Sequence, residues 1–269
     1  MPLLLSDIWP IDRPQDYKIH FARWNQRNQP LDVFARDRQE WKGWQEYRPG
    51  RNEFNRPRIF SLIQFYHEQD IWLFGGVFEV VARFEDRYEV HLQEEGSELI
   101  GRLKLHYPYR ARTTRPVMER HYKALVVQEI LKEAYSGRTF PGFEEIDLSF
   151  EELEALVRNN RDDWRFSLAS VKGIYLITDT RTGRRYVGSA YGDHGIWGRW
   201  RQYAENGHGG NVELRRIAND PDLAYARANF RFALLEHRLD RTPDELILAR
   251  EAYWKRILFT RGEQGLNRN

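Results

Sequence analysis

The 269-residue sequence has no cysteine, which excludes disulfide bonds, cysteine nucleophiles and cysteine-ligated zinc sites. It also lacks any run of about 18 apolar residues, the length that a membrane-spanning helix requires. The opening segment MPLLLSDIWP has no basic residue before its short apolar stretch and so does not resemble a signal peptide. These absences favour a cytoplasmic protein that has no membrane partner.

Several motifs of common enzymes are missing as well. The sequence has no Walker loop, no dinucleotide-binding fingerprint and no G-x-S-x-G nucleophile elbow. Its histidines are scattered and form neither an H-x-x-x-H pair nor an HExxH motif. Internal repeats and low-complexity tracts are also absent. Any catalytic chemistry must therefore come from other residue types.

The net charge of +2 is unevenly distributed along the chain. Residues 171–269 hold 17 Lys and Arg against 12 Asp and Glu, whereas residues 1–170 hold 25 against 28. A basic excess in one part of a chain favours a polyanionic partner such as nucleic acid. The first part, being slightly acidic, is expected to contact nucleic acid only locally.

The length and the patterns of the sequence predict an α+β protein of two domains, 1–165 and 166–269. The first is expected to be a mixed, β-rich domain with helices. Alternating apolar residues predict strands within 60–93 and 99–107, and Gly75-Gly76 indicates a bulge, a sharp bend or a close backbone approach. Helical spacing predicts helices at 31–47 and 121–135, and Ser149 with Glu152 forms a capping-box signature.

The second domain has a more legible pattern. It predicts two strands within 172–190, helices near 196–206 and 212–220, a strand at 230–239 and a helix that begins at Thr242 and Pro243. The order β-β-α-α-β-α predicts an α/β sandwich on a three-stranded antiparallel sheet.

Five short motifs follow one another along this second domain. GIY at 173–175 and YVG at 186–188 are followed by GRWRQY, REAYW and GLN, which supply an arginine, a glutamate and an asparagine. This series resembles the GIY-YIG nuclease family, and YVGSA with GRWRQY is most similar to the nuclease modules of phage homing endonucleases. Excision-repair relatives carry a lysine after the second half-motif; Ser189 stands there and disfavours that branch.

The two tyrosines of the motif lie on the two strands of one predicted hairpin, where cross-strand pairing brings both phenols near one site. A strand tyrosine more often packs in a core. The resemblance implies that Tyr175 is the general base or orients the attacking water, and that Tyr186 binds the water or the phosphate. Gly188 and Ser189 are assigned to DNA binding, because a glycine lets backbone or substrate approach closely.

Arg199 and Tyr203 are four residues apart and therefore share one face of a helix. A guanidinium is always charged and donates two bonds at once, which suits a phosphoryl oxygen. The resemblance implies that Arg199 clamps the phosphate in the transition state and that Tyr203 fills a position taken by Tyr or His in relatives. Arg201 points elsewhere, either to the DNA backbone or to solvent.

Glu251 lies beside the apolar stripe of its helix, with Lys255 four residues on. It forms either an i,i+4 ion pair or, as the resemblance implies, the single protein carboxylate on one Mg²⁺ or Mn²⁺ ion. In the same family an asparagine near the end of the module, here Asn267, holds the sheet and the active site together. His208 is either a proton-transfer residue or a loop histidine.

The segment PYRARTTRP interleaves Arg110, Arg112 and Arg115 with tyrosines, a pattern that suits phosphate contacts and base stacking. The first domain is alternatively a structural platform, a reader of a flipped or modified base, or a partner-binding domain. The resemblance implies a DNA endonuclease of prokaryotic defence, restriction or mobile-element biology. A structure-specific repair nuclease, a catalytically idle DNA-binding protein and a homodimer all remain open.

Overall fold

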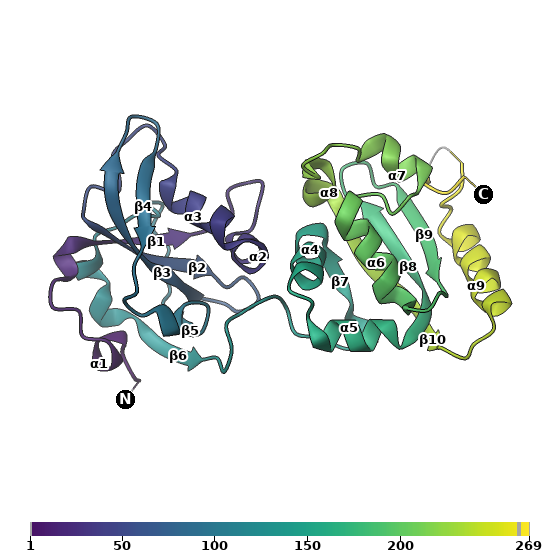
Figure 1. Ribbon diagram of the computed structural model, residues 1–269, viewed down its shortest axis with the longest axis horizontal. Helices are drawn as coiled ribbons and strands as arrows, with labels where there is room; N and C mark the ends of the chain where they lie inside the picture. The colour runs from purple at the N-terminus through teal and green to yellow at the C-terminus, as the bar shows by residue number, and fades with distance from the viewer. Residues whose placement is uncertain (1, 263–264, 269) are drawn as a thin grey trace. The chain divides into compact units, whose positions relative to one another are not determined.

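The computed structural model describes residues 2–262 and 265–268, and the chain divides into two compact units, Met1–Ser136 and Gly137–Asn269 (Figure 1). Each unit combines a β-sheet with helices, so the α+β class is confirmed. The division falls after Ser136 rather than after residue 165. The reason is that β7 (Asp147–Ser149) pairs with β10 (Phe230–Leu239) and α4 (Phe150–Arg158) packs on α6 (Gly195–Asn206), so residues 137–165 belong to the second unit.

The first unit is built on one mixed sheet with the strand order β1-β2-β3-β5-β6, in which β4 pairs with β3. β1 and β2 are parallel, and the other pairs are antiparallel. The strands are β1 (Tyr17–Ala22), β2 (Arg58–Gln64), β3 (Ile71–Arg83), β4 (Tyr88–Leu92), β5 (Leu103–His106) and β6 (Val126–Ile130); the helices are α1 (Leu5–Ile8), α2 (Pro30–Arg36) and α3 (Arg38–Glu46).

Both faces of this sheet are buried, which explains the dense apolar runs of its strands. Along β2, Phe60 and Leu62 pack into one core, while Ile59 and Ile63 pack into the other. α2 and α3 cover the second core with Leu31, Val33, Phe34 and Trp41. The predicted bulge at Gly75-Gly76 is present: Ser61 pairs with Gly76 and Leu62 with Phe74, which leaves Gly75 as the extra residue.

The helix predicted at 121–135 is wrong. This region forms a short 3₁₀ turn, Tyr122–Ala124, and then β6, which pairs with β5. The apolar stripe of the segment includes the β-branched pair Val126 and Val127, which packs well on a pleated sheet. Pairing with the edge of β5 favours the strand over the helix for this segment.

The second unit contains an antiparallel sheet with the strand order β7-β10-β8-β9. β8 (Val171–Asp179), β9 (Arg185–Ala190) and β10 are the three predicted strands, and β7 adds a fourth at the edge beside β10. The helices are α4, α5 (Asp162–Ala169), α6, α7 (Val212–Ile217), α8 (Ala224–Asn229) and α9 (Asp244–Ile257). The predicted capping box is present, since Ser149 Oγ accepts from Glu152 N at 3.1 Å and Glu152 Oε2 accepts from Ser149 N at 2.8 Å.

Helices cover both faces of this second sheet. α6 lies on one side of β8 and β9, and α9 lies on the other (Figure 1). Alternation along β8 sends Tyr175 and Ile177 into the α6 core, whereas Ile174 and Leu176 pack toward α9. Among the described residues, the outer side of β9 pairs only through an isolated bridge of Arg185 with Gly265, so β9 forms one edge of the sheet.

Among the described residues, none of the helices has the length and apolar content to cross a bilayer.

Candidate functional site

The first element of the site is the β8–β9 hairpin that carries both motif tyrosines. Tyr175 pairs directly with Gly188 across the two strands, and its side chain is fully buried. A Cβ atom on residue 188 would lie 2.4 Å from the Tyr175 hydroxyl and 2.5 Å from its Cζ. The second half-motif therefore needs a glycine at its end because the ring of the first tyrosine occupies the space of a side chain.

Tyr175 belongs to a buried cluster with two residues of α6. Its hydroxyl lies 3.0 Å from the hydroxyl of Tyr203 and accepts from Arg199 Nε at 3.1 Å. Arg199 Nη2 donates to the Tyr203 hydroxyl at 3.2 Å. The four-residue spacing of Arg199 and Tyr203 thus places both side chains against the hairpin, as predicted.

The guanidinium of Arg199 is held on several sides. Its Nη1 donates to Gln202 Oε1 at 2.7 Å and to the carbonyl oxygen of Gly209 at 2.8 Å. A guanidinium has five N–H donors, and these contacts use four of them. Among the described residues, one N–H of Nη2 makes no hydrogen bond. The guanidinium of Arg199 is therefore fixed in place and still has one N–H that can donate to a ligand.

The charges of this cluster follow from its burial. Desolvation, reinforced by the neighbouring Tyr186, raises the pKa of Tyr175, and desolvation with the Tyr175 phenol beside it raises the pKa of Tyr203. Burial alone would lower the pKa of Arg199, but the adjacent phenols outweigh it and raise that pKa. Arg199 is therefore a fixed cation between two neutral phenols.

Glu251 approaches the hairpin from the other face of the sheet. Its Oε2 accepts from Ser189 Oγ at 2.6 Å, and its Oε1 pairs with Lys255 Nζ at 2.8 Å. The i,i+4 ion pair considered from the sequence is therefore present. The Ser189 contact ties α9 to β9, which gives the residue after the second half-motif a defined place beside the carboxylate.

Asn267 closes the outer edge of β9. Its Oδ1 accepts from Val187 N at 2.9 Å, and its Nδ2 donates to the Val187 carbonyl at 2.8 Å. The side chain is buried, and the neighbouring Leu266 N donates to the Arg185 carbonyl at 2.9 Å. The side-chain amide of Asn267 and the backbone N–H of Leu266 therefore satisfy backbone groups of β9 on both sides of Tyr186, as a partner strand would.

An open pocket of about 570 Å³ lies beside β9 and the start of α6. Tyr186, Ser189, Arg199, Arg201 and Glu251 line it, together with the loop that joins β9 to α6. Tyr175, Tyr203, Asn267 and His208 are not among its lining residues. Some of the predicted site residues therefore line the pocket, and the others lie behind or beside it.

The donor chemistry of Glu251 fits a hard divalent cation. A carboxylate offers about four lone-pair sites, of which Ser189 and Lys255 use one each. Mg²⁺ commonly binds one protein carboxylate and completes its shell with waters and substrate phosphate. In residues 2–262 and 265–268, no group of three or more Asp, Glu or His side chains is placed to hold a metal ion.

The structure separates the two histidines nearest the motif. His208 lies in the loop that holds Arg199 through Gly209, its Nδ1 accepts from Gly210 N at 3.0 Å, and burial with Arg215 lowers its pKa. His194, which the sequence patterns did not single out, is exposed and lines the pocket. The sequence feature that could have indicated His194 as a site residue is its position in the short connection directly after the second half-motif.

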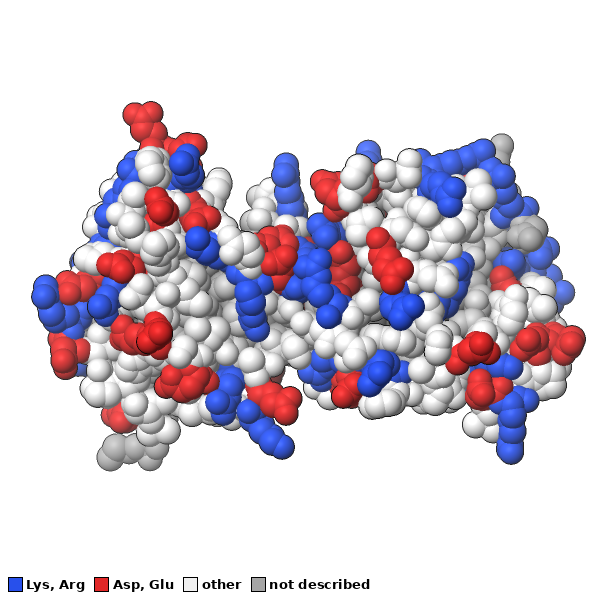
Figure 2. Space-filling view, in the orientation of Figure 1, with Lys and Arg blue, Asp and Glu red and all other residues white. Residues whose placement is uncertain are grey.

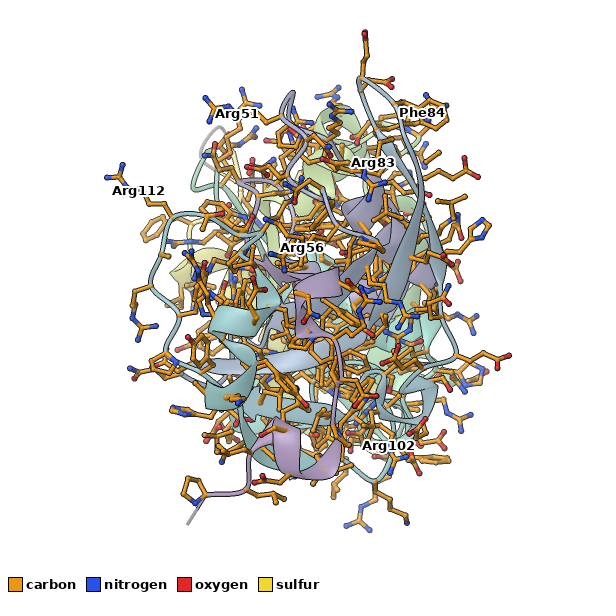
Figure 3. The ribbon with its side chains drawn as sticks, turned by 90° about the vertical axis from the view of Figure 1, so that its left-hand side faces the viewer. Arg51, Arg56, Arg83, Phe84, Arg102 and Arg112 are labelled. Atoms are coloured by element: carbon orange, nitrogen blue, oxygen red, sulfur yellow. The ribbon has the colours of Figure 1, made fainter. Side chains whose placement is uncertain are left out.

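The arginines assigned to DNA contacts have different surroundings. Arg201 is exposed and lies 3.4 Å from Glu205. Arg112 is exposed and points away from the body of the first unit (Figure 3). Arg110 is exposed but forms a two-point ion pair with Asp70, 2.9 Å at its Nη2. Arg115 is buried at 5% exposure, so it is not a surface contact for a phosphate.

Figure 2 shows acidic and basic side chains interspersed on the visible face of each unit. No extended surface of one sign appears in that view. Local contacts rather than a broad electrostatic footprint are the binding mode that such a surface favours.

Comparisons with known proteins add no precedent for this site. No protein-family model matches the sequence, no curated protein matches it, and no solved structure matches the chain. The GIY-YIG resemblance stays a prediction that rests on the motif residues.

Proposed function

We propose that this chain is a metal-dependent endonuclease that hydrolyses phosphodiester bonds in DNA. The observation that carries the proposal is the convergence of Tyr186, Arg199 and Glu251 on one pocket. These residues come from β9, α6 and α9 and span 65 positions of the sequence. A basic group, a hydroxyl and a carboxylate around an open pocket suit the transfer of a phosphoryl group.

Arg199 is the proposed clamp on the phosphate. Its remaining N–H would donate to a non-bridging oxygen, and its positive charge would stabilise the charge that develops there. Tyr175 and Tyr203 fix the guanidinium from behind and make no contact with the pocket. They are positioning residues in this proposal, whereas the family resemblance implies that Tyr175 is the general base or orients the attacking water.

Hydrolysis forms a bond from a water oxygen to phosphorus, breaks the bond to the 3′ oxygen and moves one proton from the water to a base. The Tyr186 hydroxyl and the His194 imidazole line the pocket and are proposed to orient the water and accept that proton. Glu251 would hold one Mg²⁺ or Mn²⁺ ion, whose contribution when bound is to neutralise the phosphate and the leaving oxygen.

The test is a cleavage assay on single-stranded, double-stranded and plasmid DNA with Mg²⁺, with Mn²⁺ and with EDTA. Glu251→Gln is compared with Glu245→Gln, an exposed carboxylate of the same helix. We expect metal-dependent products that Glu251→Gln abolishes and Glu245→Gln preserves. If no DNA is cut with either metal, the proposal that the chain is an endonuclease is wrong. If Glu251→Gln keeps full activity, the assignment of Glu251 as the metal ligand is wrong.

A further inference from the structure

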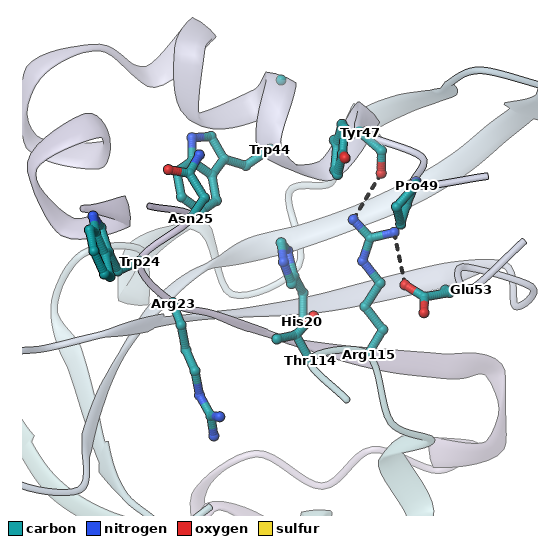
Figure 4. A pocket seen from close by; sticks show the side chains of 11 residues that line it. His20, Arg23, Trp24, Asn25, Trp44, Tyr47, Pro49, Glu53, Thr114 and Arg115 are labelled. Atoms are coloured by element: carbon teal, nitrogen blue, oxygen red, sulfur yellow. Dashed lines mark hydrogen bonds and ion pairs between the residues drawn. The ribbon is translucent and has the colours of Figure 1, made fainter. Parts of the chain in front are cut away.

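The first unit contains a second pocket, of about 520 Å³, that the proposed chemistry does not use (Figure 4). It opens between β1 and α3 and is completed by the segments that follow α3 and precede residue 116. Three of its eleven lining residues are Trp or Tyr, and six carry polar or charged side chains, so the pocket combines rings with hydrogen-bonding groups as ligand sites do.

Three aromatic side chains border this pocket and remain accessible to water. Trp24 is 57% exposed, Tyr47 is 63% exposed and Trp44 is half-buried. Large rings are rarely left uncovered together, because their apolar surface gains free energy when it is buried. A planar ligand that stacks on one or more of these rings would bury that surface.

Gly43 lines the same pocket from the interior of α3. A glycine inside a helix is destabilising by about 1 kcal/mol relative to alanine, so its presence needs a reason. The fold gives none: a Cβ built on Gly43 meets no atom within 4 Å. A ligand that approaches the helix backbone would supply the reason, because only glycine leaves that space open.

His20 provides an oriented acceptor on the floor of the pocket. Gln45 Nε2 lies 3.4 Å from the carbonyl of Trp41, so Gln45 Oε1 faces the imidazole and accepts from His20 Nδ1 at 2.7 Å. Ser61 Oγ also donates to that oxygen at 3.1 Å. Burial and the neighbouring Arg115 lower the pKa of His20 to about 3, which leaves Nε2 as an unprotonated acceptor.

Arg115 provides the complementary donor. It is 95% buried, and its Nη2 donates to the Tyr47 carbonyl at 2.8 Å. Its Nη1 makes no hydrogen bond among the described residues and lies 3.4 Å from Glu53 Oε2, the dashed contact in Figure 4. A buried guanidinium N–H without a hydrogen bond is costly, and a ligand acceptor would satisfy it.

The charged groups that face this pocket are few. Arg23 belongs to the lining, but its guanidinium points away from the other lining side chains (Figure 4). It donates to the carbonyl oxygens of Tyr109, at 2.6 Å, and Ala111, at 3.2 Å, and lies over the ring of Trp72. Arg115 and Glu53 are then the charged pair of the pocket, a balance that suits an uncharged planar ligand with hydrogen-bonding groups at its edge.

We propose that this pocket binds a nucleobase: the base stacks on the exposed rings, and its edge meets His20 and Arg115. The inference rests on the proposed function in taking DNA as the source of the base, and an unpaired base is the form whose face and edge are both free. A free nucleotide offers the same chemistry and is the other source to be distinguished.

The experiment uses the full chain carrying Glu251→Gln, in EDTA, so that it does not depend on cleavage. Fluorescence anisotropy compares a paired duplex with the same duplex carrying one extrahelical base, and nucleoside monophosphates and inorganic phosphate serve as competitors. Gly43→Leu fills the pocket at a position where leucine also favours the helix. Phe84→Ala, which removes an exposed ring directly after β3 that does not line the pocket, is the control (Figure 3).

We expect the extrahelical base to tighten binding by roughly tenfold or more, the range of base stacking on an aromatic ring. Gly43→Leu should remove this gain and Phe84→Ala should keep it. Competition by a nucleoside monophosphate without a preference for the extrahelical base would identify the free nucleotide as the source. Equal binding of both duplexes without nucleotide competition, or an unchanged gain in Gly43→Leu, overturns the proposal.

Discussion

The hydroxyl of Tyr175 accepts a hydrogen bond from Nε of Arg199 at 3.1 Å, inside the core of the second unit. This contact joins the first half-motif on β8 to the arginine on α6. It explains why the tyrosine and the arginine belong to one pattern although 24 positions separate them. The ring is placed by packing and the guanidinium is placed by the ring.

Replacing Tyr175 by phenylalanine should therefore act on both stability and catalysis. The change leaves Arg199 Nε without a partner and leaves the buried Tyr203 hydroxyl with Arg199 Nη2 alone, which costs about 1–3 kcal/mol of unfolding free energy. DNA affinity should change little while the rate of cleavage falls, because the guanidinium loses one of the four contacts that fix its position. Urea denaturation and single-turnover cleavage measure the two effects, and Tyr253→Phe on exposed α9 is the control.

The variant Gly188→Ala tests the close packing of the hairpin. Its new methyl group would fall 2.4 Å from the Tyr175 hydroxyl, and overpacking of a core destabilises by about 1–3 kcal/mol. Gly192→Ala, where a Cβ meets no atom within 4 Å, should leave the unfolding free energy unchanged. Equal stability of the two variants in urea would show that the ring of Tyr175 moves away at little cost.

The position of the division at Ser136 predicts which fragment folds. A fragment of 137–269 keeps Phe150, Leu153 and Trp164, all fully buried in the core of the second unit. A fragment of 166–269 loses them, and each large apolar side chain removed costs about 3–5 kcal/mol. We expect cooperative thermal unfolding by circular dichroism from the longer fragment only. A cooperative transition in the shorter one would contradict this assignment.

The buried histidine of the first unit predicts a loss of stability in acid. The pKa of His20 is lowered to about 3 in the folded chain, against an ordinary value of about 6.5 in the unfolded chain. Between these two pH values the unfolded chain binds more protons at His20 than the folded chain does. Protonation therefore favours the unfolded chain, and the free energy of unfolding falls as the pH drops below about 6.5.

The slope from this one group is at most about 1.4 kcal/mol per pH unit. Thermal denaturation at a series of pH values should show a shallower decline for His20→Gln than for the unchanged chain. His91→Gln, at an exposed position of β4, is the matched control and should decline like the unchanged chain. Identical slopes for all three proteins would rule out the neutral, buried state of His20.

The sequence predicted those features whose cause is local. The capping box of Ser149 and Glu152 forms because both partners lie within one turn. The shared placement of Arg199 and Tyr203 follows from the helical repeat, and the bulge at Gly75-Gly76 follows from an interruption of alternation. Each of these needs only a few neighbouring residues.

Other features depend on partners that the sequence does not place. β7 has three residues and exists because β10 offers it a free edge. Arg115 reads like its neighbours Arg110 and Arg112, yet it alone of the three is buried, because Tyr47, Glu53 and Phe54 enclose it. The direction of Tyr175, away from the pocket that Tyr186 faces, depends on where α6 packs.

The amide of Asn267 on the edge of β9 also bears on how the protein is made. Val187 and Asn267 are 80 positions apart, which a ribosome covers in roughly 4–16 s at roughly 5–20 residues per second. During that interval the nascent hairpin has an unpaired edge, the feature that invites pairing with another chain. Glu251 is also added within it, so the pocket gains its carboxylate before β9 is sealed. A newly made chain would therefore be most prone to aggregation in the seconds before Asn267 covers the edge of β9.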